Sequence, residues 1–207
     1  MRVIVVTDFD ETLIEQNTLM AAYRELSDTP LVFSVIRAFV KGRWLWCGPR
    51  TAIKEEMYQR MLRGKHEDEL TIAGRRIARH VALNQAAVSR IQPFLDQGHE
   101  LIVASAALAR IVQTILEEKG LVFSRIVATQ PEIEDRKLTG LLIDGECFGK
   151  IKAQRIKQVR KTFYPGGHMV AFGNWPDDYP LLAEADEAYI VKGNTIETFN
   201  KEHTTWQ

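Results

Sequence analysis

The chain has 207 residues, of which 27 are Lys or Arg and 27 are Asp or Glu, so its formal net charge at pH 7 is zero. This length suffices for one substantial domain, or for one domain carrying a smaller inserted one. The balanced charge gives no indication of a nucleic-acid partner, no apolar stretch is long enough to span a membrane, and the short N-terminal apolar run is not a signal peptide.

The first predicted element is a buried strand over residues 3–7, a run of mostly β-branched residues. Asp8 and Asp10 follow at its carboxyl end, and in extended chain two side chains spaced two apart project to the same side. Two adjacent carboxylates repel each other unless a cation or a shared proton lies between them. A hard divalent cation with oxygen ligands is the simplest solution, although this pair alone is also compatible with a polar strand end and a turn.

Residues 17–81 contain no convincing strand, and their apolar spacing indicates helices. A connection rich in helix breakers at residues 41–49 carries Trp44 and Trp46. The whole block is too long for an ordinary crossover, so we expect an insertion after the first strand. The predicted helices of this block are residues 19–26, 31–40, 51–62 and 67–82.

After this block the chain alternates between strand and helix, which implies an α/β fold with a parallel, doubly wound sheet and right-handed crossovers. Residues 137–143 resemble half of a hairpin that interrupts the alternation. The predicted strands are 101–104, 121–127, 168–172 and 188–191, and the predicted helices are 85–97, 108–119, 150–160 and 179–184.

Further polar residues stand where these strands end or where a helix begins. Parallel strands place their carboxyl ends at one edge of a sheet, so such residues can converge on the two aspartates. Taken singly, a serine after a strand usually caps the next helix, and a lysine in a first helical turn is usually solvated. The residues in question are Ser105, Lys152, Asn174 and Asp178.

These motifs, in this order, resemble the haloacid dehalogenase (HAD) superfamily, in its phosphoserine-phosphatase-like branch (subfamily IB, with a helical C1 cap). Residues 8–12 (DFDET) match the first motif, DxDxT, and residues 173–178 (GNWPDD) stand where the family has GDxxxD. Ser105 matches the second motif and Lys152 the third. Lys150 competes with Lys152, which we prefer because apolar residues follow it four and seven positions later. The resemblance implies a Rossmann-like core of residues 1–14 and 86–207 and a helical cap of residues 15–85.

The resemblance also implies the chemistry, which is phosphomonoester hydrolysis with Mg²⁺. Asp8 would be the nucleophile that forms an aspartyl-phosphate, and Asp10 would be the general acid and base. Ser105 and Lys152 would hold the transferring phosphoryl group. The implied phosphate-binding residues are Thr12, Ser105, Ala106 and Lys152, and the implied metal ligands are Asp8, Asp10, Asn174 and Asp178.

Two positions depart from the family pattern. Glu11 replaces a residue that is often small, and Asn174 stands where the family usually has a metal-ligating Asp. An amide oxygen can bind Mg²⁺ but brings no charge, so we expect weak metal binding, which Asp177 could partly restore. Phosphoserine phosphatases carry a carboxylate soon after the first motif, whereas the matching position here is Asn17, so we do not expect phosphoserine as the substrate.

Three functions remain open at this point. The first is a cytoplasmic phosphatase of a small phosphorylated metabolite, a location that fits the widely spaced Cys47 and Cys147 as free thiols in a reducing compartment. The second is a phosphatase of a lipid-borne or apolar phosphate, with peripheral lipid contact through residues 44–46. We favour interior packing for those residues, because large apolar side chains are usually buried. The third is a weakly active protein that binds a phosphorylated ligand, suggested by Asn174.

Overall fold

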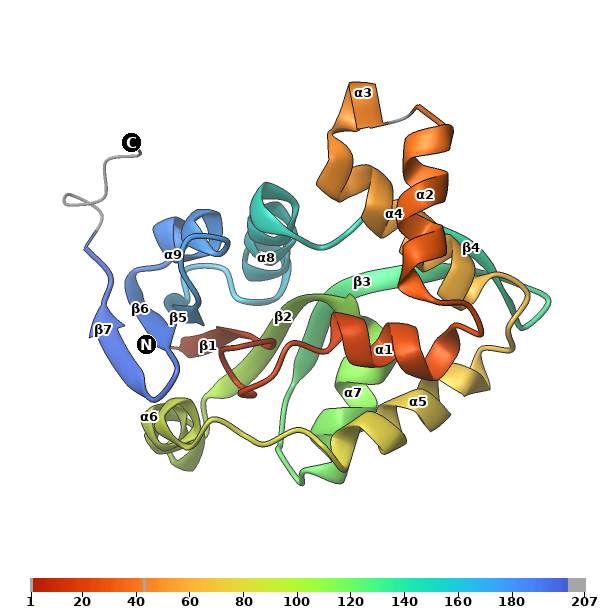
Figure 1. Ribbon diagram of the computed structural model, residues 1–207. Helices are drawn as coiled ribbons and strands as arrows, with labels where there is room; N and C mark the ends of the chain where they lie inside the picture. The colour runs from red at the N-terminus through yellow and green to blue at the C-terminus, as the bar shows by residue number, and fades with distance from the viewer. Residues whose placement is uncertain (1, 43, 201–207) are drawn as a thin grey trace.

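The computed structural model describes residues 2–42 and 44–200 of the chain. Its centre is a seven-stranded sheet with the order β4-β3-β2-β1-β5-β6-β7, in which β4 and β7 pair antiparallel at the two edges and the five inner strands are parallel (Figure 1). The predicted α/β fold is confirmed, whereas the edge strand β7 was not predicted. The strands are β1 (Val3–Asp8), β2 (Glu100–Leu108), β3 (Arg125–Glu134), β4 (Lys137–Ile143), β5 (His168–Gly173), β6 (Glu187–Lys192) and β7 (Thr195–Thr198).

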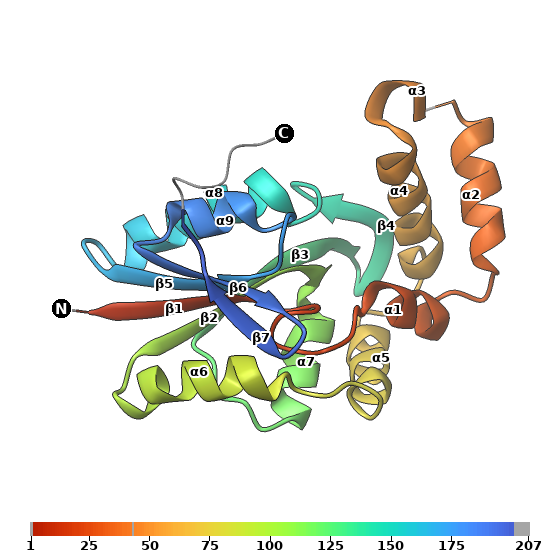
Figure 2. The ribbon, with the colours of Figure 1, turned by 60° about the vertical axis from the view of Figure 1, so that its left-hand side comes forward.

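Helices cover both faces of the sheet, as Figure 2 shows: α6 (Gln85–Asp96) and α7 (Ala109–Glu118) lie on one face, and α8 (Gly149–Phe163) and α9 (Tyr179–Glu184) on the other. Val5 of β1 belongs to the apolar core that includes Ile91 of α6, and its neighbours Ile4 and Val6 belong to the core that includes Ile156 of α8. Both faces of β1 are buried, which is why its sequence is continuously apolar rather than alternating.

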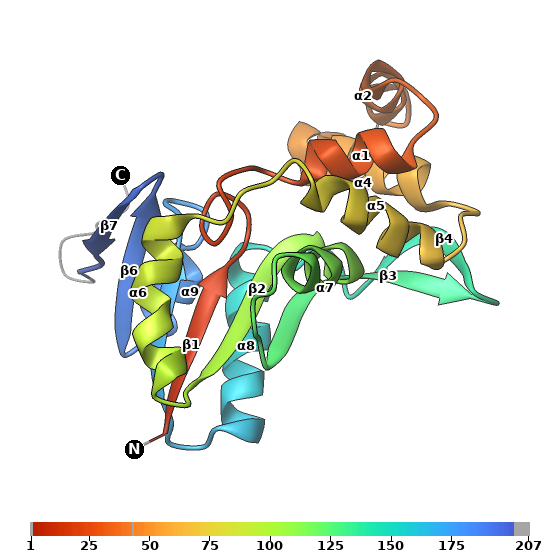
Figure 3. The same ribbon diagram turned by 90° about the horizontal axis from the view of Figure 1, so that it is seen from below.

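Among the residues that the structure describes between β1 and α6 there are five helices, and we call them the inserted helices. They lie beyond the carboxyl ends of the parallel strands (Figure 3). Their predicted bounds are confirmed for the first two, while the last helix ends at residue 78 rather than 82. The inserted helices are α1 (Leu19–Leu26), α2 (Leu31–Val40), α3 (Trp44–Cys47), α4 (Pro49–Leu62) and α5 (Asp68–Ala78).

The inserted helices are joined to the rest of the chain by their two connecting segments, and they also pack against α7 and the β3–β4 hairpin. Helix α5 packs so closely on α7 that a Cβ atom at Gly74 would lie 2.7 Å from the Cβ atom of Thr114. The β3–β4 hairpin forms backbone hydrogen bonds with the α4–α5 connection, in which Gly64 N donates to Leu138 O over 2.8 Å. A division of the chain into core and cap at residues 15 and 85 therefore stays a prediction.

The predicted strand at residues 121–127 is wrong in its position, because β3 begins only at residue 125. The backbone N–H of Leu121 donates to Leu116 O over 3.0 Å at the end of α7, and that of Ser124 donates to Leu101 O over 2.8 Å. These residues form the connection into β3. Strand β2 likewise runs past residue 104, and its pairing with β3 shifts register between Ser105 and Leu108.

The expectation that residues 44–46 pack in the interior is wrong for two of the three. Trp46 is 93% exposed and Leu45 is 68% exposed. Trp44 instead packs against Phe39 of α2, with ring centroids 5.6 Å apart. Helix α3 has only four residues and buries none of them. It lies at the end of α4 farthest from the sheet, where few other elements are near enough to cover its side chains (Figures 1 and 2). Across the described residues, no helix has the length and apolar character needed to cross a membrane.

Candidate active site

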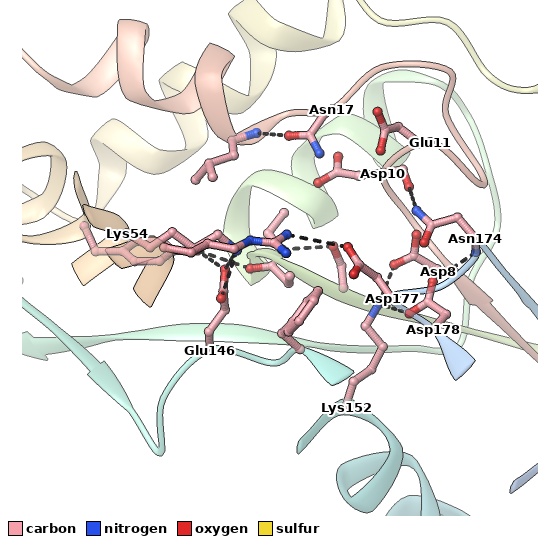
Figure 4. A pocket seen from close by; sticks show the side chains of 17 residues that line it. Asp8, Asp10, Glu11, Asn17, Lys54, Glu146, Lys152, Asn174, Asp177 and Asp178 are labelled. Carbon is pink, nitrogen blue, oxygen red and sulfur yellow. Dashed lines mark hydrogen bonds and ion pairs between the residues drawn. The ribbon is translucent and has the colours of Figure 1, made fainter. Parts of the chain in front are cut away.

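A cavity of about 140 Å³ lies at the carboxyl ends of β1, β2 and β5, and α4 forms its other wall (Figure 4). The parallel sheet places these strand ends side by side, as the sequence predicts. The cavity contains all the residues predicted to act on the phosphoryl group or the metal except one. Those that line it are Asp8, Asp10, Ser105, Ala106, Lys152, Asn174 and Asp178.

Lys152 is the buried cation at the centre of this cavity. Its Nζ atom lies 2.6 Å from Asp8 Oδ1 and 2.7 Å from Asp178 Oδ1 (Figure 4). Burial works to lower the pKa of Lys152, but the two carboxylates outweigh it and hold that pKa above its usual value. The neighbouring Lys150 is exposed and does not line the cavity, so Lys152 is the lysine that reaches the site.

The Asp10 carboxyl group is held by the start of α1. Its Oδ1 atom accepts hydrogen bonds from the backbone N–H of Thr18 over 3.0 Å and from the Thr18 hydroxyl over 2.8 Å. Burial and the negative charge of Asp8 raise the pKa of Asp10 to about 7, against the opposing effect of the Thr18 hydrogen bonds. A carboxyl group with such a pKa can donate a proton and later accept one near neutral pH.

Asp178 approaches the end of β5 very closely. A Cβ atom at Gly173 would lie 2.7 Å from the Cβ atom of Asp178, so this approach requires glycine. Asp178 Oδ2 accepts a hydrogen bond from Asn174 N over 3.1 Å, which fixes the loop between them. Burial and the charge of Asp8 raise the pKa of Asp178, while Lys152 opposes that rise.

The second-motif residues lie where β2 changes register. Ser105 is buried, and its hydroxyl accepts a hydrogen bond from Ala107 N over 3.0 Å. The carbonyl of Ala106 accepts hydrogen bonds from the hydroxyls of Thr129, over 2.7 Å, and Tyr58, over 3.3 Å. Thr12 is fully buried and does not line the cavity, so the structure does not bring it together with the other predicted phosphate-binding residues.

Oxygen atoms suitable for a hard cation lie together in this site. Within residues 2–42 and 44–200, no three His, Cys, Asp or Glu side chains form a ready metal cage. Asp10 would contribute its backbone carbonyl and Asn174 its amide oxygen. These two groups are neighbours, because Asn174 Nδ2 donates a hydrogen bond to Asp10 O over 3.4 Å. Together with the Asp8 carboxylate in the same cavity, these groups offer only oxygen ligands, which suit Mg²⁺. Two of the ligands, the Asp10 carbonyl and the Asn174 amide, carry no charge.

The sequence reasoning missed the polar face of α4. Arg50, Lys54 and Tyr58 are spaced four apart and line the cavity. Figure 4 shows Lys54 beside Glu146. Lys54 Nζ lies 2.8 Å from Glu146 Oε1, the Tyr58 hydroxyl donates to the same oxygen over 3.1 Å, and Arg50 lies 3.6 Å from Asp177. Burial and the charge of Glu146 raise the pKa of Tyr58. The four-residue spacing was the available signal, and it was obscured by the apolar face of the same helix.

Comparison with known proteins agrees with this geometry. The model of the family described as haloacid dehalogenase-like hydrolase matches residues 5–183, and the chain therefore belongs to that family of hydrolases. Its fold is shared with solved structures of phosphoserine phosphatases. The family match confirms the prediction of a HAD-family hydrolase. No curated protein matches the chain in sequence.

Several solved structures share this fold at low sequence identity. A protein of unknown function from Bordetella pertussis Tohama I has a TM-score of 0.72 and 19% identity, over 91% of this chain and 89% of that one. A substrate-bound phosphoserine phosphatase has a TM-score of 0.61 and 19% identity, over 91% and 85% of the two chains. A HAD family hydrolase from Salmonella enterica serovar Typhi has a TM-score of 0.61 and 19% identity, over 89% and 61%.

Proposed function

We propose that this protein is a Mg²⁺-dependent phosphomonoester hydrolase that acts through an aspartyl-phosphate on Asp8. The observation that carries the proposal is the buried contact between Asp8 and Lys152 in a cavity that also contains the Asp10 carboxyl group. A carboxylate nucleophile, a fixed positive charge and an acid–base group are the three components that this reaction needs from the protein.

The reaction divides into two displacements at phosphorus. An oxygen of Asp8 attacks the phosphorus, the bond to the leaving oxygen breaks, and Asp10 donates its proton to that oxygen. Asp10 then takes a proton from water, whose oxygen attacks the phosphorus and releases Asp8 and inorganic phosphate. Lys152 offsets negative charge throughout. Mg²⁺, held by Asp8, the Asp10 carbonyl and Asn174 with Asp178 nearby, would neutralise and orient the phosphate.

The substrate we propose is a small phosphorylated metabolite, with a leaving group that meets the polar face of α4. Lys54 and Glu146 pair with each other there and present both signs of charge to it. Phosphoserine is not favoured, because Asn17 brings no carboxylate and its Oδ1 accepts a hydrogen bond from Leu19 N over 3.2 Å. We also propose a cytoplasmic location, with which the buried thiol of Cys147 is in keeping.

One observation favours a second candidate, the phosphatase of a lipid-borne or apolar phosphate. A larger cavity of about 580 Å³ adjoins the first and shares Lys54, Tyr58 and Phe148 with it. Its walls also include Leu141 and Ile151. An apolar leaving group would find room there while its phosphate faced Asp8.

A panel of phosphorylated metabolites and phospholipids, assayed with and without Mg²⁺, tests both candidates. We expect Mg²⁺-dependent phosphate release from at least one compound, and Asp8→Asn should abolish it while leaving the circular dichroism spectrum unchanged. Activity of Asp8→Asn within a few-fold of the parent protein would rule out the covalent mechanism. Binding of phosphorylated compounds without turnover would favour a weakly active phospholigand-binding protein, as Asn174 suggested.

A further inference from the structure

Helix α2 buries small residues and exposes large apolar ones, the reverse of the usual arrangement of an amphipathic helix. The two residues it buries are small, Ser34 and Ala38, and the Ser34 hydroxyl lies 3.0 Å from that of Tyr23. Most of its large apolar side chains are exposed instead. The short helix α3 follows at the outer end of the inserted helices (Figures 1 and 2). We define the α2–α3 surface by the exposed residues Val32, Phe33, Ile36, Val40, Leu45 and Trp46.

This concentration is unusual within the molecule. Isolated exposed apolar residues are normal in proteins, but a contiguous set of them marks a binding surface. Trp46 is 93% exposed and Val40 is 81% exposed, within six residues of each other. Leaving these side chains in water costs free energy that a covering partner would recover.

Positive charge adjoins this surface. In sequence, residues 31–47 contain three Lys or Arg and no Asp or Glu, and two of the three, Arg37 and Lys41, lie in the part of the chain that the structure describes. Arg37 and Lys41 share a single carboxylate, that of the buried Glu56. Lys and Arg beside outward apolar and tryptophan side chains are typical of helices that lie in the surface of an anionic membrane.

We propose that the α2–α3 surface binds the surface of an anionic lipid membrane. Helix α2 has ten residues and is about 15 Å long, so it lies in the interfacial layer and does not cross it. Its apolar side chains enter the boundary between headgroups and acyl chains. Arg37, whose side chain is 55% exposed, reaches the phosphates with the guanidinium N–H groups that Glu56 does not occupy, and Lys41 stays paired with Glu56 on α4.

A second copy of the chain is a poorer occupant of this surface. In a twofold dimer the same patch faces itself, so the surplus of positive charge would meet its own copy. Like charges brought together across an interface cost binding free energy, whereas anionic headgroups reduce that repulsion.

Sedimentation with lipid vesicles tests the proposal, and the chain offers a matched pair of variants. Val40, 81% exposed, lies on the α2–α3 surface, and Val122, 79% exposed, lies after α7. Val40→Asp and Val122→Asp make the same chemical change, and both sites are open enough to leave folding intact. The vesicles are phosphatidylcholine alone, or phosphatidylcholine with an equal amount of phosphatidylglycerol.

We expect the parent protein and Val122→Asp to sediment with the anionic vesicles, more weakly at 0.5 M salt, and neither to sediment with phosphatidylcholine alone. Val40→Asp should bind the anionic vesicles about tenfold more weakly, because it places a charge in the apolar layer. Equal binding by the two variants, or no vesicle binding by the parent protein, would overturn the proposal. A dimer that Val40→Asp dissociates, without vesicle binding, would overturn it in favour of a second copy.

Discussion

Replacing Lys152 by Met tests the electrostatics of the site, because it exchanges a buried ammonium group for an apolar side chain of similar length. Lys152, Asp8 and Asp178 have side chains that are only 3%, 6% and 2% exposed. Without the ammonium group, two buried carboxylates face each other with no cation between them. Breaking a buried ion pair on one side costs about 3–5 kcal/mol of unfolding free energy.

The pH dependence of this cost has a definite sign. Burial and the charge of Asp8 already raise the folded-state pKa of Asp178, and the variant loses the opposing effect of Lys152, so its folded state binds a proton at Asp178 more tightly than its unfolded state does. The free energy of unfolding of the variant therefore increases as the pH falls from the raised folded-state pKa towards the unfolded-state pKa. The increase is about 1.4 kcal/mol per pH unit for each proton bound. We therefore expect the destabilisation of Lys152→Met, relative to the parent protein, to shrink by about 1–2 kcal/mol between pH 7.5 and pH 5.5.

Urea unfolding of the parent protein, Lys152→Met and Lys150→Met at both pH values measures this. Lys150 is exposed on the same helix, so its substitution should change the unfolding free energy by no more than about 0.5 kcal/mol. Phosphatase activity of Lys152→Met should fall about 10²–10³-fold, while that of Lys150→Met should be unchanged. Equal destabilisation by the two substitutions, or a cost for Lys152→Met that is the same at both pH values, would refute the reasoning.

Two other substitutions address the metal and the acid–base group. Asn174→Asp adds a unit of negative charge beside the Asp10 carbonyl and should lower the Mg²⁺ concentration for half-maximal activity, and identical midpoints in a metal titration would contradict this. Thr18→Val removes the hydroxyl hydrogen bond that opposes the rise in the pKa of Asp10, which is about 7 with that bond in place, so the pKa should rise further. Because Asp10 acts first as an acid, the basic limb of the pH profile of kcat/KM should move to higher pH, and an unmoved limb would show that Asp10 does not set it.

The sequence predicted the long, regular elements well because their periodicity is local. Helices α1 and α2 begin and end at the predicted residues, and the parallel order follows from the alternation of strand and helix. Strand β7 was missed because it has four residues and exists only as an edge paired to β6. Helix α3 was missed because a stretch rich in Gly and Trp gives no helical periodicity, and its stability comes from its contact with α4.

The site also has a part that could be predicted from local sequence patterns and a part that could not. Asp8, Asp10 and Lys152 could be predicted to converge, because the carboxyl ends of parallel strands share one edge. The contact between Lys54 and Glu146 joins positions 92 apart in the sequence, and it depends on how α4 is set against the core. No local pattern determines that orientation, so this part of the cavity could be described only from the structure.

The β3–β4 hairpin decides which part of this chain could be exchanged with a relative. Three backbone hydrogen bonds of 2.8–2.9 Å join the hairpin to the α4–α5 connection, through Gly64, Leu138 and Glu67. A chimaera that takes only residues 15–85 leaves these groups without their partners, at about 1 kcal/mol each, and separates Gly74 from the α7 residue that it fits. The inserted helices are therefore matched to the β3–β4 hairpin and to α7 of their own chain, and recombination at the ends of the helical insertion alone would separate these contacts.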